Sequence, residues 1–184
     1  MVTDGGGWTV FQQRKRKLRG KGFQRPWTGC KNGFGRTGSA QRGYWIGLDD
    51  LNSLTSNGRY TLRVDLNTTN EAGYAIYSNF SVGDESTGYQ LKLNYSRGTI
   101  GDSMTENNGM KFSTSDRDND NNSAYNMAIY TGGPWWHNSV LRSNLNSVYM
   151  SSTGYCNQYI TWRTWKDPCV EAIIFSEMKL RRDV

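Results

Sequence analysis

Residues 113–122 read Ser-Thr-Ser-Asp-Arg-Asp-Asn-Asp-Asn-Asn and place carboxylates at alternate positions, Asp116, Asp118 and Asp120. Such carboxylates repel one another and stay extended until a cation that prefers oxygen ligands neutralises them. Calcium fits this set of carboxylate, amide and carbonyl oxygens, so the run predicts a calcium loop. The alternative is an Asp/Asn-rich turn without metal, because these residues also favour turns.

Aromatic residues follow the acidic run at Trp135-Trp136-His137, and Ser143-Asn144-Leu145-Asn146 comes shortly afterwards. From about residue 96 to 155 the chain is rich in Gly, Asn, Ser and Asp and shows little periodicity. An irregular region of this length within a compact chain usually carries function. A cation loop beside an aromatic surface is typical of a recognition site.

The first half of the chain predicts strands, because apolar and polar residues alternate and β-branched and aromatic residues are frequent. A short helix is expected at 48–54, where apolar residues have helical spacing, and a strand within 170–179 is expected to return to the sheet. We expect one antiparallel sheet from Trp8–Gln12, Tyr60–Leu66, Tyr74–Phe80 and Tyr89–Tyr95.

Composition predicts one loop-rich domain with few long helices. Of the 184 residues, 21 are glycine and 13% are aromatic, which supplies burial that the modest 35% hydrophobic content lacks. No apolar run reaches the roughly 20 residues that a membrane span needs. Sequons at Asn67, Asn79, Asn94 and Asn121 are compatible with secretion, although such triplets also arise by chance.

Three cysteines cannot all pair within one chain. Cys156 and Cys169 flank an aromatic segment and could close a short loop, so we expect a disulfide between them in an oxidising compartment. Cys30 is then free, bonded to another chain, or without its partner.

The net charge of +6 is unevenly distributed. A basic block between Arg14 and Arg25 could contact a heparin-like polyanion. The simpler interpretation is a solvated loop or hairpin edge. Trp135 and Trp136 are expected to form core and pocket wall and not a nucleic-acid stacking platform, because that stretch lacks nearby cations.

The motif order over nearly the whole chain resembles the fibrinogen-like domain family of fibrinogen chains, ficolins, tachylectins, tenascins and angiopoietins. The residues that carry the resemblance are Thr3–Gln12, Gly33–Gly35, Tyr44–Leu48, Tyr60–Val64, Phe112–Thr114, Asp116–Asp120, Trp135-Trp136, Ser143–Asn146 and Glu177–Lys179. Met1 follows the place where family members have a Cys-bearing strand, so we expect an N-terminal truncation.

The resemblance implies an α+β fold of the fibrinogen C-terminal type, with a twisted antiparallel sheet and short helices. Residues 1–184 are expected to form one domain, sheet-rich to about residue 95, then a loop-rich calcium and ligand part. The family pattern assigns calcium to the side chains of Asp118 and Asp120 and to two carbonyls, those of Asn122 and Ala124, with Ser123 as the alternative to Ala124.

Three departures from the family concern the ligand region. The disulfide that usually brackets it is absent, since its positions hold Met127 (or Asn126) and Val140, and packing of Met127 against Val140 is expected to restore some order. The family histidine is replaced by Leu141, and at least one pocket tyrosine is lost. The remaining ligand-binding residues implied by the resemblance are Tyr130, Trp136, His137, Tyr155 and Asn157.

His137 is the only histidine, and a surface packing role is expected for it in preference to chemistry. No hydrolase elbow, HExxH, P-loop or dinucleotide fingerprint occurs, so no enzyme activity is expected. The resemblance implies a secreted, calcium-dependent lectin for acetylated or simple glycans on microbial or host surfaces, in innate immunity. It is compatible with a homo-oligomer. The alternative is a protein-binding adhesion or signalling module.

Overall fold

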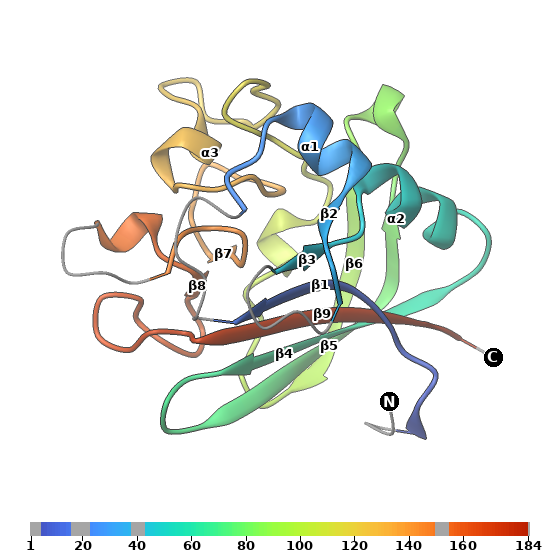
Figure 1. Ribbon diagram of the computed structural model, residues 1–184, viewed down its shortest axis with the longest axis horizontal. Coiled ribbons are helices and arrows are strands. Elements are labelled where there is room, and N and C mark those ends of the chain that lie inside the picture. Colours follow the sequence, from blue (N-terminus) through green and yellow to red (C-terminus); the bar gives the residue numbers. More distant parts are fainter. Residues whose placement is uncertain (1–4, 16–22, 38–42, 150–154, 184) are drawn as a thin grey trace.

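The computed structural model describes residues 5–15, 23–37, 43–149 and 155–183. Seven strands of this described chain form one sheet in the order β2-β3-β1-β9-β4-β5-β6, and each pairing is antiparallel (Figure 1). The strands are β1 (Thr9–Lys15), β2 (Phe34–Gly35), β3 (Tyr44–Trp45), β4 (Tyr60–Asn67), β5 (Ala72–Val82), β6 (Leu91–Gly98) and β9 (Phe175–Arg182). A second, two-stranded sheet pairs β7 (Ser143–Asn144) with β8 (Thr161–Trp162).

Helices are few and short, as the composition predicted. They are α1 (Trp27–Asn32), α2 (Leu48–Thr55), α3 (Met127–Tyr130) and the 3-10 turns η2 (Glu85–Thr87), η3 (Thr105–Asn107) and η4 (Cys156–Gln158). The helix expected at 48–54 is confirmed as α2, whereas α1 and α3 were not predicted. No helix among the described residues combines the length and the apolar character that crossing a lipid bilayer requires.

The strand at the C-terminal end occupies the middle of the sheet. β9 lies between β1 and β4, with Glu177 opposite Gln13 on one side and Met178 opposite Val64 on the other. The expected returning strand is therefore confirmed, but it begins at Phe175 and not at Val170. The reason is a turn in which the backbone N–H groups of Val170 and Glu171 both donate to the carbonyl of Asp167.

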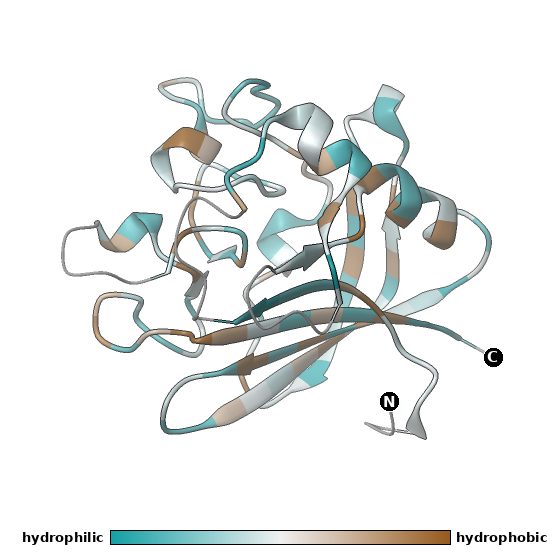
Figure 2. Cartoon of the chain, viewed as in Figure 1, coloured by the Kyte–Doolittle hydropathy of each residue, from teal (hydrophilic) through white to brown (hydrophobic). Residues whose placement is uncertain are grey.

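One face of the sheet is apolar, and α1, α2 and the long loops cover it (Figure 1). Leu62, Val64 and Leu66 of β4 point into this core and are fully buried, as the alternating pattern predicted. Figure 2 shows hydrophobic segments on these central strands, while the surrounding loops are largely hydrophilic. The core joins both halves of the chain, because the rings of Trp45 and Trp136 approach to 6.2 Å.

Central positions of β9 also bury charged side chains, but these are paired. The ammonium of Lys179 lies 2.7 Å from Asp65 Oδ2 and 3.0 Å from Glu177 Oε1, and Gln13 Nε2 donates to Glu177 Oε2 at 2.7 Å. This chain of contacts crosses β1, β9 and β4, so it links the N-terminal strand to the hairpin that follows. The architecture confirms the α+β arrangement expected from the resemblance, an antiparallel sheet with short helices and long loops.

Candidate functional site

The acidic run lies in a loop that is fastened to the Trp pair. Ser113 and Trp135 exchange backbone hydrogen bonds of 2.9 and 3.2 Å, which form an isolated antiparallel bridge. Asn119 extends the attachment, because its backbone N–H donates to Ser113 Oγ and its side chain donates to the carbonyl of Phe112. The structure therefore brings together the two motifs that the sequence singled out.

Asp116, the first carboxylate of the run, is used to fasten the loop to α1. Its Oδ1 accepts the backbone N–H of Trp27 at 2.9 Å and the hydroxyl of Thr114 at 2.6 Å. Burial acts to raise the pKa of Asp116, but these two hydrogen bonds outweigh burial and leave the pKa below its usual value. Asp116 is thus a structural carboxylate.

Asp118 and Asp120 face one another across a tight turn. The backbone N–H of Asp120 donates to Asp118 Oδ1 at 3.3 Å, and Asp120 itself accepts backbone N–H groups of Asn122 and Met127, both at 2.8 Å. Burial and the neighbouring Asp120 raise the pKa of Asp118. A pair of close carboxylates is the electrostatic arrangement that a divalent cation relieves.

The backbone after Asp120 continues into a further turn. Asn122 Oδ1 accepts the N–H groups of Ala124 at 2.9 Å and Tyr125 at 3.3 Å. No described residue donates a hydrogen bond to the main-chain carbonyl of Asn122, Ser123 or Ala124. Two carboxylates and several unengaged carbonyls form a hard-oxygen donor set, and such a set fits calcium.

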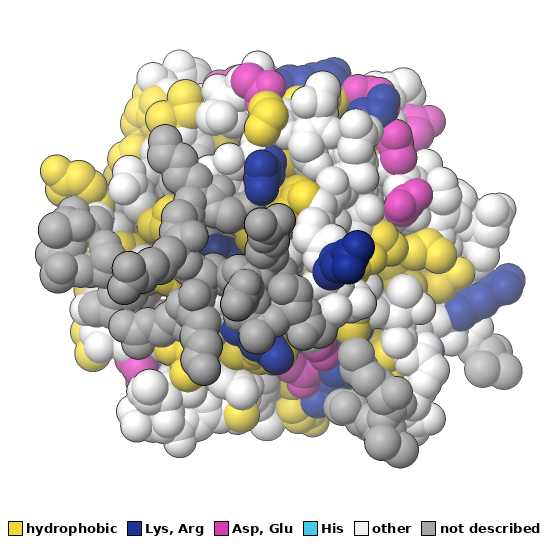
Figure 3. All heavy atoms as spheres, in the orientation of Figure 1, with side chains coloured by type: hydrophobic (Ala, Val, Ile, Leu, Met, Phe, Trp, Pro, Cys, Tyr) yellow, Lys and Arg dark blue, Asp and Glu magenta, His cyan; other side chains and the backbone are white. Residues whose placement is uncertain are grey.

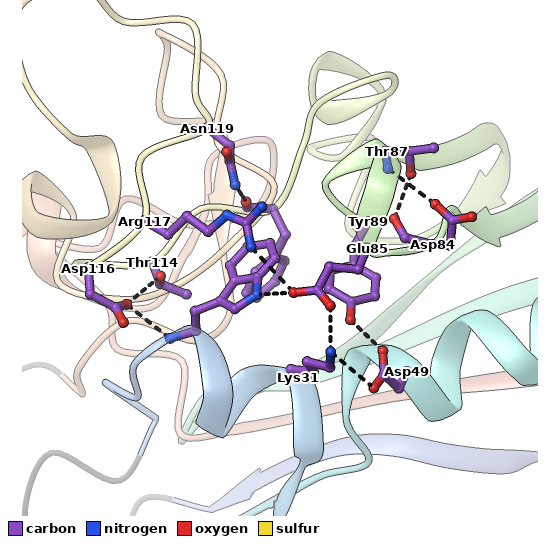
Figure 4. A network of polar contacts seen from close by, with 12 residues as sticks. Lys31, Asp49, Asp84, Glu85, Thr87, Tyr89, Thr114, Asp116, Arg117 and Asn119 are labelled. Atoms are coloured by element: carbon purple, nitrogen blue, oxygen red, sulfur yellow. Dashed lines mark hydrogen bonds and ion pairs between the residues drawn. The ribbon is translucent and has the colours of Figure 1, made fainter.

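A polar network joins the acidic loop to α1, α2 and η2 (Figure 4). The guanidinium of Arg117 stacks over the Trp27 ring at 3.9 Å and lies 3.4 Å from Glu85 Oε1, which also accepts the Trp27 indole N–H at 2.8 Å. Glu85 Oε2 is paired with Lys31, whose ammonium also lies 3.8 Å from Asp49 Oδ2.

Sequence reasoning missed this network, because its contributing segments are far apart in the chain. Trp27 and Glu85 are separated by 58 positions, and Trp27 and Asp116 by 89. Local spacing contains no signal for such pairs. The one available hint was an arginine between carboxylates, at Arg117.

Two side chains predicted to contact a ligand are in the core. Trp136 is fully buried against Phe112, and its indole N–H donates to the carbonyl of Tyr89 at 2.8 Å. His137 is also buried, and its Nε2 lies 2.8 Å from the carbonyl of Gly133. The surface role expected for His137 is wrong, because its side chain is buried, whereas the core position expected for Trp136 is confirmed. Contact of either residue with a ligand stays a prediction.

The other predicted ligand residues lie nearer the surface. Tyr130 is exposed and packs its ring on Tyr125 at 4.7 Å, and Asn157 Nδ2 donates to the Tyr130 carbonyl at 3.1 Å. Tyr155 is 73% exposed and Leu141 is half-buried. The structure thus joins Tyr130 to Asn157 directly, and ligand binding by these residues stays a prediction.

The expected disulfide is confirmed and lies directly after Tyr155. Cys156 and Cys169 are bonded, with their Cα atoms 5.0 Å apart, and Cys30 is a free, buried thiol. The expected packing of Met127 against Val140 is wrong, because Met127 is buried whereas Val140 is 52% exposed.

Arg14, the first residue of the basic block, does not contribute to a cationic surface. Arg14 is buried between the rings of Phe23 and Tyr149, and its Nη1 donates to the carbonyls of Leu145 and Ser147. Burial lowers the pKa of Arg14 to about 10. Its expected contact with a polyanion is therefore corrected, and most of the block, residues 16–22, lies outside the described residues.

A cavity of about 270 Å³ beside α3 was not predicted. Its wall includes Gln24, Arg25, Ser115, Ile129 and Gly133. Gln24 Nε2 donates to the carbonyl of Gly132 at 2.9 Å, so the segment before α1 is held against the loop after α3.

Comparison with known proteins finds relatives that match nearly the whole chain. Tenascin-R of Gallus gallus is 44% identical over 181 residues, which cover 98% of this chain and 13% of the relative. Fibrinogen-like protein A of Apostichopus parvimensis is 41% identical over 185 residues, which cover 98% of this chain and 62% of the relative. The chain thus spans only about 13% of the length of the tenascin-R relative.

Solved structures share the fold. The fibrinogen-like globe domain of human ANGPTL6 superposes with a TM-score of 0.88 at 34% identity, covering 100% of this chain and 81% of that chain. Lamprey fibrin D-dimer complexed with the peptide Gly-His-Arg-Pro-amide gives a TM-score of 0.85 at 30% identity, covering 100% of this chain and 64% of that chain. The family model of the fibrinogen beta and gamma chains, C-terminal globular domain, matches residues 1–183. This chain therefore belongs to the fibrinogen C-terminal globular domain family.

Proposed function

We propose that this chain is an extracellular protein-recognition module whose binding surface is built on the Asp118–Asp120 loop and α3. The observation that carries the proposal is the distribution of aromatic and apolar side chains around that loop. Trp136 and His137, which a closed sugar pocket would need, are buried, whereas Tyr125, Ile129 and Tyr130 are 48%, 60% and 44% exposed.

The exposed side chains form a patch suited to a protein partner. Figure 2 shows α3 as a hydrophobic segment, and in Figure 3 hydrophobic side chains gather at the upper left, where Figure 1 places α3. Aromatic residues are enriched at protein interfaces, where they supply contact area at low conformational-entropy cost. The solved lamprey relative is complexed with a peptide, which supports recognition of polypeptide by this fold.

Calcium is the cofactor that we propose for the loop. The residues that would hold it are Asp118 and Asp120 through their side chains and Asn122 through its carbonyl, with Ala124 or Ser123 supplying a further carbonyl. A bound calcium ion would neutralise the two facing carboxylates. Asp120 also accepts the N–H of Met127, the first residue of α3, so the position of the loop determines the position of the patch.

An extracellular location agrees with the Cys156–Cys169 disulfide, because disulfides persist in oxidising compartments. Lectin activity is the second candidate. It is favoured by one contact, the hydrogen bond from Asn157 to the Tyr130 carbonyl, which keeps two of the predicted sugar-binding residues together near the surface.

Parallel binding assays distinguish the two functions. The chain is applied to an array of extracellular-matrix and cell-surface proteins and to a glycan array, each with calcium and with chelator. We expect calcium-dependent protein binding that Ile129→Asp abolishes. The matched control is Val170→Asp, since Val170 is 79% exposed but lies far along the chain, next to the disulfide. Glycan binding without protein binding would overturn the proposal in favour of the lectin.

A further inference from the structure

The chain contains four Asn-x-Ser/Thr sequons, and the fold places them in different environments. They begin at Asn67, Asn79, Asn94 and Asn121. The sequence motif marks all four as candidates for modification. The four sites differ in how exposed the asparagine side chain is and in whether it already forms hydrogen bonds. These differences matter because a glycan must remain in solvent after the chain has folded.

Asn94 and Asn79 lie together at one edge of the large sheet. Asn94 is exposed on β6, the terminal strand, and faces Ser78 in the register of the β5–β6 pairing. Asn79 is the next residue of β5 and is also exposed, at the irregularity where the register shifts between Ser78 and Ser81. Its φ of 52° is left-handed, a conformation that asparagine tolerates better than most residues.

Both amide groups are available. No described residue makes a hydrogen bond to the side chain of Asn79 or of Asn94. The neighbouring residues Phe80 and Leu93 are buried, so pleating of the strands directs the two asparagines away from the core. A bulky substituent on either amide would extend into solvent.

The side-chain amides of Asn67 and Asn121 are less available for a glycan. Asn67 is half-buried at the end of β4, where Ala72 and Phe175 flank it on both sides. Asn121 is exposed, but its Nδ2 donates to Asn138 Oδ1 at 2.9 Å. A glycan on Asn121 would disrupt this contact directly beside Asp120.

We propose that Asn79 and Asn94 are the N-glycan attachment sites of this chain. In the secretory pathway the side-chain Nδ2 attacks C1 of an oligosaccharide linked to a lipid pyrophosphate. The N–C1 bond forms, the C1–O bond to pyrophosphate breaks, the lipid pyrophosphate leaves, and the proton of the amide nitrogen passes to a base of the host transferase. The inference rests on the secretion included in the proposed function.

Glycans at these positions would shield the part of the sheet edge beyond Leu93, because Leu91 at the start of β6 already makes backbone hydrogen bonds to Gly109 and Met110. Unpaired edge strands can add further strands, and proteins commonly block them with charge, bulges or covering groups. β6 already exposes Lys92 and Arg97, and β5 carries the irregularity at Asn79. Carbohydrate on this edge would confine partner binding to other surfaces, among them the patch on α3.

The assignment is tested on the chain produced in cultured animal cells behind a cleavable secretory leader. Peptide-N-glycosidase F in heavy-oxygen water converts each glycosylated asparagine to labelled aspartate, and peptide mass mapping locates the label. We expect label at Asn79 and Asn94 and none at Asn67 or Asn121. An unlabelled Asn79 or Asn94 overturns the assignment of that residue. Label at Asn67 would show that exposure does not select the sites, and label at Asn121 would show that its hydrogen bond to Asn138 does not prevent modification.

Variants that each remove one sequon test the sites separately. Ser96→Ala removes the Asn94 sequon at an exposed position, and Ser81→Ala removes the Asn79 sequon. Each should lose one glycan in gel mobility, whereas the control Ser123→Ala, which removes the Asn121 sequon, should lose none. Because the leader enforces entry into the secretory pathway, unglycosylated protein that still binds a protein partner contradicts only this inference.

Discussion

Asp120 accepts the backbone N–H of Met127 at 2.8 Å, and Met127 is the first residue of α3. One carboxylate therefore belongs both to the proposed calcium loop and to the N-terminal end of the helix that exposes Ile129 and Tyr130. A change in the position of Asp120 can be transmitted to that surface through this hydrogen bond. This contact explains how a cation could control binding without touching the partner.

Calcium should stabilise the folded chain. A ligand at 100 times its Kd adds about 2.7 kcal/mol, which corresponds to a Tm increase of roughly 5 to 10 °C in a domain of this size. Scanning calorimetry with calcium and with chelator measures the effect. The double variant Asp118→Asn/Asp120→Asn should abolish the increase.

Asp116→Asn is the matched control for that experiment. Asp116 belongs to the same acidic run, but its Oδ1 accepts hydrogen bonds from Trp27 and Thr114. An amide oxygen can still accept them, so the calcium-induced Tm increase should persist. If this variant lost the increase as completely as the double variant, the assignment of the metal ligands would be wrong.

Arg117→Ala should lower the free energy of unfolding by about 1 kcal/mol, because the variant loses the cation–π contact with Trp27. Chemical denaturation measures this loss. Arg142→Ala is the control, since Arg142 forms an ion pair with Glu106 in which both side chains are about half exposed. Exposed pairs contribute roughly 0 to 1 kcal/mol. Equal losses for the two variants would show that the stacking on Trp27 is unimportant.

Acidification should destabilise the chain through His137. Burial lowers the pKa of this imidazole to about 4, against about 6.5 when unfolded. Between these values the unfolded state binds a proton that the native state does not, so stability falls as pH falls. We expect the free energy of unfolding to be about 2 kcal/mol lower near pH 5 than near pH 7.5.

The His137→Asn variant isolates that contribution from the carboxylates that also titrate in acid. Denaturant melts of both proteins at the two pH values should show a smaller pH dependence for the variant. Identical pH dependence in the two proteins would rule out a buried, neutral His137.

The disulfide should contribute measurably to stability. Cys156 and Cys169 are 13 positions apart, and the chain-entropy model gives about 3 kcal/mol for a loop of about this length. Cys156→Ser/Cys169→Ser should lower the free energy of unfolding by up to this amount in urea titrations. An unchanged unfolding midpoint would mean that the loop is ordered without the bridge.

Cys30 should be inert in the folded chain. It is 1% exposed, and burial raises the pKa of its thiol to about 12. Because the thiolate is the reactive form, iodoacetamide at neutral pH should not alkylate native protein. Mass spectrometry should detect one alkylated cysteine per chain after denaturation without reductant. Rapid labelling of the native protein would contradict the burial of Cys30.

Local sequence patterns were sufficient for features whose parts are neighbours in the chain. Alternation identified β4, β5 and β6, although β6 begins at Leu91 and not at Tyr89, where φ is 53°. The acidic run, the helix α2 and the Cys156–Cys169 bridge were recognised for the same reason. In each case the decisive interaction connects residues that are a few to about a dozen positions apart.

Contacts between distant segments could be decided only by the tertiary structure. The position of β9 between β1 and β4 and the burial of Arg14 and His137 depend on which segments meet in space. The same holds for the network that joins Trp27, Glu85 and Arg117. Periodicity tells which side of a strand is apolar, but not which partner will cover it, because burial and hydrogen bonding depend on packing. The sequence alone thus identified the family and predicted the metal ligands, while the fold determined which side chains remain exposed.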